Sequence, residues 1–185
     1  MGQKFSELNK LHIDFIQQQK MFFVATAANH GRVNLSPKGF DSFRIFNLNQ
    51  VAWLNVTGSG NETAAHVLEN PRMTIMFCAF EGKPVILRLY GKAKVYYPRD
   101  QEWQNYAQHF ALLPGTRQIF VMNIDLVQTS CGMGIPLFNY KNQRSELIEW
   151  AEDRGKLGVE EYWRKKNQSS IDDMPTGMFE GSVEK

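Results

Sequence analysis

The chain has 185 residues, of which 43% are apolar and 12% aromatic, and its formal net charge is +2. This length and apolar content suffice for one buried core, so we expect a single domain over 1–185. Lys and Arg are scattered rather than clustered, which argues against a nucleic-acid partner. Cys78 and Cys131 match no metal-ligand spacing and no disulfide framework, so we expect no metal site and a reducing, cytoplasmic location. We expect neither a signal peptide nor a membrane span, because no run approaches the ~20 apolar residues that a span needs.

The first 70 residues predict a helix, two strand hairpins and a second helix. Leu8, Leu11 and Phe15 recur at helical spacing with polar residues opposite. The turn signal Asn29-His30-Gly31 predicts the first hairpin, and Pro37-Lys38-Gly39 is expected to end its second strand. In chain order, the expected elements are a helix at 6–19, strands at 21–28, 32–36, 43–48 and 51–56, and a helix at 60–70.

The remaining residues add three strands, two helices and a tail. Gly91 lies in the middle of the longest strand pattern, where it predicts a bend or bulge. Short turns join most strands and strict strand–helix alternation is missing, so we expect a mainly antiparallel sheet closed into a barrel with peripheral helices. The expected elements are strands at 72–80, 85–97 and 118–128, helices at 98–110 and 145–166 (interrupted at Gly155 and Gly158), a helical extension over about 142–167, and a loose tail at 168–185.

The turn between the strand at 51–56 and the following helix is a candidate anion site. Two glycines, Gly58 and Gly60, end the strand, and the unpaired N–H groups of a helix N-terminus attract negative charge. The hydroxyls of the turn, at Thr57, Ser59 and Thr63, could add donors. An alternative needs no ligand: Ser59 and Glu62 have the spacing of a capping box, in which each side chain bonds the other's backbone.

Polar side chains also share one face of the strand at 32–36. Because side chains alternate along a strand, Arg32, Asn34 and Ser36 lie on one face, and Val33 and Leu35 lie on the other. A lone Arg on a hairpin is usually solvated, and only the shared face favours a ligand role for Arg32. Lys38 after a proline is commonly exposed turn chemistry.

These segments together resemble the pyridoxamine 5′-phosphate oxidase-like family of FMN-binding split-barrel proteins, over roughly residues 5–138. That family has a strand of outline Arg-x-Val-x-Leu-x-Lys, a strand ending in Thr, a Ser-Arg-Lys triplet that opens a helix, and Asn-Pro-Arg before an apolar strand. In this chain, Arg32-Val-Asn-Leu-Ser-Pro-Lys38 resembles the first element and Thr57 matches the terminal Thr. Asn61-Glu62-Thr63 falls on the triplet, and Asn70-Pro71-Arg72 matches the last motif.

The resemblance implies an antiparallel split β-barrel, a homodimer, and FMN bound in a cleft between the subunits. It also implies that the first strand lies along the flavin and that the turn faces the phosphate and the ribityl chain. The loop at 129–134 would approach the cleft from the other subunit. The flavin-binding residues expected on this basis are Arg32, Asn34, Leu35, Ser36, Lys38, Thr57, Ser59, Asn61, Thr63, Cys131 and Gly132.

Two departures separate this chain from the vitamin B6 oxidase itself. Glu62 and Thr63 stand where the family often has Arg and Lys, so two cationic partners of a phosphate are missing and a carboxylate takes their place. Arg32 or Lys38 could compensate, and Glu62 could turn back onto Ser59. The Arg-x-His substrate clamp of the B6 oxidase has no counterpart after Cys131, so its reaction is not expected here and the chain is identified with a distinct branch.

The hypothesis favoured by these residues is a flavin-dependent oxidoreductase with FMN as cofactor. Its substrate, its electron donor and any catalytic residue are unknown, and the cofactor carries the redox chemistry while the protein binds and orients it. The alternative is a non-catalytic FMN-binding or haem-binding protein on the same barrel. A third possibility is a structural dimer that has lost its ligand, which the missing Arg and Lys would permit.

Overall fold

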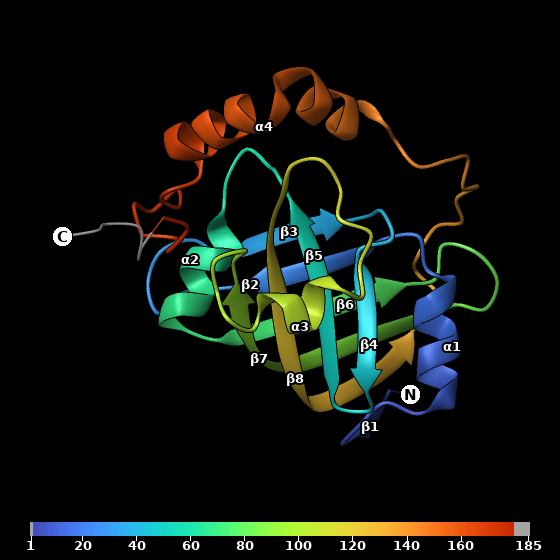
Figure 1. Cartoon of the computed structure of the whole chain (residues 1–185). Coiled ribbons are helices and arrows are strands. Elements are labelled where there is room, and N and C mark those ends of the chain that lie inside the picture. Colours follow the sequence, from blue (N-terminus) through green and yellow to red (C-terminus); the bar gives the residue numbers. More distant parts are fainter. Residues whose placement is uncertain (1, 180–185) are drawn as a thin grey trace.

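The computed structural model describes residues 2–179, in which eight antiparallel strands form one sheet. The sheet order is β3-β2-β6-β7-β8-β5-β4, and β1 pairs with the free part of β8. The strands are β1 (Gln3–Phe5), β2 (Phe22–Thr26), β3 (Asn34–Lys38), β4 (Phe43–Asn47), β5 (Gln50–Val56), β6 (Arg72–Cys78), β7 (Val85–Tyr96) and β8 (Thr116–Cys131). The helices are α1 (Lys10–Gln18), α2 (Glu62–Glu69), α3 (Trp103–Ala107) and α4 (Glu146–Lys166). The predicted architecture, a mainly antiparallel sheet with peripheral helices, is confirmed (Figure 1).

Two long strands give the sheet its curvature. β8 pairs with β7 along most of its length and also with β5 and β1, so it connects the two halves of the sheet. The register of β7 and β8 shifts between Tyr90 and Gly91, which confirms the predicted irregularity at Gly91. The backbone oxygen of Asn123 lies so close to Gly91 that a Cβ there would come within 2.0 Å of it. Only glycine allows the two strands to approach this closely.

Apolar side chains form two buried clusters, one on each face of β5 and β8. The larger one fills the barrel and contains the stacked rings of Trp53 and Phe120, whose centroids are 4.5 Å apart. The smaller one lies between these strands and α3, where Leu54 and Ile119 contact Trp103. This alternation follows from the two-residue period of the strands. It fixes which side chains of β5 and β8 point into the barrel.

The structure differs from the predicted elements in several respects, and α1 begins at Lys10 instead of residue 6. β1 was not predicted, because three residues carry too short a pattern. β3 continues through Pro37 to Lys38, where a break was expected, because β3 is an edge strand and an edge strand tolerates proline. α3 spans only Trp103–Ala107, shorter than the predicted 98–110. β8 continues to Cys131, so part of the predicted loop is strand.

The chain after α4 packs against the barrel, and the prediction of a loose tail at 168–185 is wrong for 168–179. Thr176 is fully buried, and its backbone oxygen accepts a hydrogen bond from the Tyr97 hydroxyl. Arg99 donates to the backbone oxygens of Gly177 and Met178. These contacts were not visible in the sequence because the segment is polar. Residues 180–185 lie outside the described part of the chain.

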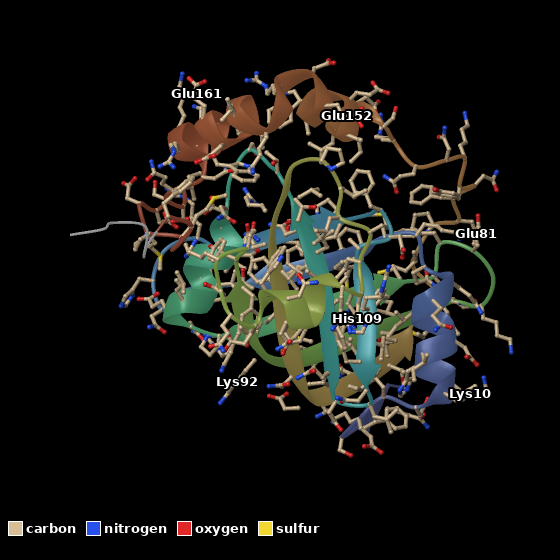
Figure 2. The ribbon with its side chains drawn as sticks, viewed as in Figure 1. Lys10, Glu81, Lys92, His109, Glu152 and Glu161 are labelled. Atoms are coloured by element: carbon tan, nitrogen blue, oxygen red, sulfur yellow. The ribbon has the colours of Figure 1, made fainter. Side chains whose placement is uncertain are left out.

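The helix α4 crosses the end of the barrel at which β5 ends and α2 begins (Figure 1). It is broken at Gly155, whose φ of 62° and ψ of 174° are not helical, as the sequence predicted, but it continues through Gly158, where a second interruption was expected. Glu152 and Glu161 lie on its outer side, away from the sheet (Figure 2). The inner side therefore faces the turn before α2. Among the described residues, no helix is long and apolar enough to cross a membrane.

Candidate functional site

A cleft of about 550 Å³ lies between β3 and the turn that joins β5 to α2. Asn34 on β3 donates from Nδ2 to Oγ1 of Thr63 on α2 at 3.1 Å, which ties the two segments together. Ser36 and Lys38 share the cleft face of β3 with Asn34, because side chains alternate along the strand. Arg32 precedes the strand and borders the same cleft. The structure thus brings together the two segments from which the sequence predicted a site.

The turn at 57–61 is held by hydrogen bonds within the chain. The backbone N–H and the hydroxyl of Thr57 both donate to the carbonyl oxygen of Gly115 at 2.9 Å. The indole Nε1 of Trp163 donates to the same hydroxyl at 2.7 Å. The sequence suggested that the Thr57 hydroxyl could donate to a ligand. In the structure its single proton is already used in the bond to Gly115. Ser59 is exposed at the tip of the turn.

The predicted capping box at the start of α2 is absent. The helix begins at Glu62 with Asn61 as N-cap, and no side chain bonds the first-turn amides. Glu62 points instead to the C-terminal segment, where its two carboxylate oxygens accept from the Ile171 N–H at 3.2 and 3.0 Å. Asn61 is buried, and its Oδ1 accepts from the Gln118 side chain. The first turn of α2 is thus left without the side-chain cap that the ligand-free interpretation required.

Three cations border the cleft, and their environments differ. Arg32 forms an ion pair with Asp172, whose carboxylate also accepts the Arg32 backbone N–H at 2.7 Å. These contacts lower the pKa of Asp172, the backbone bond contributing most. Asp172 belongs to the tail that was predicted to be loose, and it meets Arg32 because the tail folds back against the residues before β3.

Lys38 is the second cation, and it lies 4.9 Å from the centre of the Trp53 ring. Burial, with a smaller effect from the positive charge of Arg117, lowers the pKa of Lys38 to about 8. The sequence favoured an exposed turn for Lys38. The structure places it in the cleft because β3 extends beyond Pro37.

Arg117 on β8 is the third cation, and the sequence did not single it out. Its side chain is 3% exposed, and Nη1 donates to the Gly60 carbonyl at 3.0 Å and to Asn167 Oδ1 at 2.7 Å. Burial lowers the pKa of Arg117 to about 10, so it is charged at neutral pH. The sequence offered one signal for Arg117: it directly precedes the predicted apolar strand at 118–128.

Among the described residues, five buried side-chain polar atoms have no hydrogen-bond partner: four lie in or beside the cleft, and the fifth, His66 Nε2, lies on α2 outside its lining. Of the four, Ser36 Oγ and Arg117 Nε belong to residues that line the cleft. The other two are Trp53 Nε1 and Gln118 Oε1. The Trp53 ring contacts Lys38, and the Gln118 side chain bonds Asn61. Leaving such a group unpaired costs about 1–3 kcal/mol, so natural proteins rarely leave several together. Their concentration here indicates a surface that binds a polar ligand.

Three of the predicted residues lie outside the cleft. Leu35 faces the opposite side of β3 and is 63% exposed. Cys131 and Gly132 lie at the far end of β8, where Cys131 pairs with Val85 and the Gly132 N–H donates to the Pro84 carbonyl. The structure therefore does not bring these three to the remaining residues within one chain.

Comparison with known proteins gives consistent results. A family model described as pyridoxamine 5′-phosphate oxidase matches residues 8–131. The pyridoxamine 5′-phosphate oxidase family protein ustO of Aspergillus flavus is 34% identical over 182 residues, covering 88% of this chain and 72% of that protein.

Two solved structures are similar in fold. A putative pyridoxamine 5′-phosphate oxidase from Lactobacillus delbrueckii has a TM-score of 0.53 and 14% identity, over 66% of this chain and 94% of that chain. HupZ from Group A Streptococcus has a TM-score of 0.51 and 18% identity, over 64% of this chain and 91% of that chain. At these identities the likeness concerns the fold alone, and the predicted split β-barrel class is confirmed.

Proposed function

This chain belongs to the pyridoxamine 5′-phosphate oxidase family, and we propose on that basis that it is a flavoprotein that binds FMN in the cleft between β3 and α2 and uses it as an oxidoreductase. The observation that carries the proposal is the pair of unsatisfied polar groups, Ser36 Oγ and Arg117 Nε, beside the buried cation Lys38. A bound phosphorylated flavin would supply partners for all three.

The residues present fit such a ligand. A cleft of about 550 Å³ is within the usual size of a cofactor site. Ser36 can donate to or accept from the polar edge of a flavin ring, and Lys38 adds a positive charge beside it. The Glu62 carboxylate borders the cleft and accepts the Ile171 N–H, so its negative charge has to be offset by a cation when a phosphate binds. Asn34 would keep β3 and α2 at a fixed separation through its bond to Thr63.

FMN, when bound, supplies transfer of a hydride or of electrons, which needs no nucleophile from the protein. The chain would bind the cofactor, orient it and control the polarity around it. Lys38 has a pKa of about 8 and can therefore hold or release a proton at Nζ near neutral pH. Trp53, fully buried beneath Lys38, excludes water from one side of that ammonium group.

The proposal includes a homodimer with the flavin at the subunit interface. Val33, directly before the edge strand β3, and Leu35, on β3, are 73% and 63% exposed although both are apolar. Exposed apolar side chains at a sheet edge are typical of a surface that another chain covers. In this arrangement, Cys131 and Gly132 would approach the cleft of the partner. Light scattering coupled to size-exclusion chromatography measures the mass directly.

The visible spectrum of the purified protein tests flavin binding. We expect a yellow protein that releases FMN on denaturation. In flavin-depleted protein, FMN should raise the melting temperature, and Ser36→Ala should weaken FMN binding by about 3- to 10-fold, the value of one hydrogen bond. Ser6→Ala is the matched control, because Ser6 is exposed and outside the cleft. A protein that neither carries nor binds FMN would refute the proposal.

A second measurement separates a catalyst from a silent flavin binder. Under anaerobic conditions, NAD(P)H or another electron donor should bleach the bound flavin of an oxidoreductase. Flavin that binds but is reduced by no donor would favour the non-catalytic alternative.

A further inference from the structure

We propose that Arg117 recognises the phosphate group of the flavin, supplying from β8 the positive charge that the start of α2 lacks. This inference rests on the proposed function and names a ligand-binding residue outside the two segments that form the predicted site. It assigns the phosphate monoester to the end of the cleft beneath the turn at 57–61.

The backbone at the start of α2 favours an anion, but the side chains there do not. Its first-turn amides have no side-chain cap, and the helix dipole adds a partial positive charge. However, the first helical residue is Glu62, and the neighbouring Thr63 hydroxyl accepts from Asn34. Charge-assisted bonds contribute most to phosphate binding, so a phosphate here needs a cation from another element.

Arg117 is the cation best placed to meet that need. Arg32 is bound by Asp172 through both its side chain and its backbone, and its side chain is 70% exposed. Lys38 lies over Trp53. Arg117 instead reaches the turn itself, where it donates to the carbonyl of Gly60.

The guanidinium of Arg117 has binding capacity left. Both of its hydrogen bonds use Nη1, whereas Nε is buried without a partner. Within residues 2–179 no carboxylate bonds it, and its hydrogen-bond partners are the Gly60 carbonyl and the amide oxygen of Asn167. Its pKa of about 10 keeps it charged at neutral pH. A buried positive charge with an open donor is a strong binding site for an anion.

Asn167 is the positioning residue for Arg117. It is fully buried, and its side chain accepts from Arg117 through Oδ1 while Nδ2 donates to the carbonyl of Gly58 at 3.2 Å. Its backbone oxygen accepts from Thr176 Oγ1 at 2.7 Å. Asn167 therefore links the turn, Arg117 and the C-terminal segment, which lies outside the region that the family model matches.

The test compares two ligands that differ only in the phosphate, FMN and riboflavin, by calorimetry on the flavin-depleted full chain. We expect the wild-type protein to prefer FMN. Arg117→Gln should reduce that preference by about 10- to 100-fold, the range expected for a charged hydrogen bond, with little change for riboflavin. Arg88→Gln is the matched control, because Arg88 bonds Ser130 on the other part of β8 and should keep the preference. Asn167→Ala should reduce the preference in part, which a purely structural role would not do selectively.

Two further measurements keep the test decisive if Arg117→Gln does not fold. Arg117→Lys retains the charge and should retain part of the preference for FMN. Inorganic phosphate should weaken binding of FMN, but not of riboflavin, to the wild-type protein. Equal affinity of the wild-type protein for the two ligands would overturn this inference while leaving the proposed function intact. Binding of neither ligand would overturn both.

Discussion

The buried charge of Lys38 predicts that its removal stabilises the protein. The ammonium group keeps a pKa of about 8 against an ordinary value of 10.5, mainly because burial disfavours the charged form. At 1.36 kcal/mol per pH unit, this difference corresponds to a destabilisation of about 3 kcal/mol at neutral pH. The contact with the Trp53 ring recovers about 1 kcal/mol. We therefore expect Lys38→Met, which keeps the length of the side chain, to raise the free energy of unfolding by about 2 kcal/mol at pH 7.

The pH dependence identifies the cause of this gain. Between pH 8 and 10.5 the unfolded chain retains a proton on Lys38 that the folded chain has lost, so the wild-type protein becomes more stable relative to the variant as pH rises. The advantage of Lys38→Met should be complete below pH 8 and should shrink towards pH 10.5.

Urea denaturation of flavin-depleted protein at pH 7 and pH 10 measures both values, since bound ligand would add its own stabilisation. Lys92→Met is the matched control: Lys92 is exposed on β7 (Figure 2), and its replacement should change stability by less than about 0.5 kcal/mol. Destabilisation by Lys38→Met at pH 7, or a gain that is the same at both pH values, would refute the reasoning.

Two further predictions concern the frame of the site. Gly91→Ala should destabilise the protein by at least about 2 kcal/mol in urea denaturation, because its Cβ would meet backbone rather than a movable side chain, whereas Gly134→Ala, with open space around it, should be neutral. Asp172→Asn should accelerate amide hydrogen exchange at Arg32 and at Ile171 by freeing the C-terminal segment. Because the pKa of Asp172 is lowered, its contribution to stability is present above pH 3.8 and is lost as pH falls below it, so wild type and variant should converge in acid.

The sequence predicted most of the fold because the strands obey a two-residue period and the turns carry clear signals. The hairpins, the irregularity at Gly91 and the break in α4 at Gly155 each depend on local chemistry and were correctly placed. The failures occurred where a distant contact decides the outcome. β1 exists only through its pairing with β8, and the segment after α4 is ordered by Tyr97, Arg99 and Glu62, none of which is near it in sequence.

The sequence predicted which segments form the candidate site, but it did not predict how the charged residues Glu62 and Arg117 are arranged in it. The face shared by Asn34 and Ser36 and the turn before α2 follow from periodicity and from the glycines. The partner of Glu62 could not be foreseen, because a capping box and a long-range bond to Ile171 use the same carboxylate. Arg117 was missed because a single charged residue beside an apolar run does not reveal whether its side chain is buried.

The strongest argument for a ligand is that three destabilising features of the ligand-free protein lie in the same cleft. Lys38 on β3 is a buried ammonium group, Ser36 on the same strand has an unpaired hydroxyl, and Arg117 on β8 has a buried unpaired donor. Each costs stability by itself, and imperfect packing would distribute such costs over the molecule instead of along one cleft. An anionic ligand with a polar ring would relieve all three at once. Its binding energy would then include the relief of these costs, so ligand-free protein should be distinctly less stable than the complex.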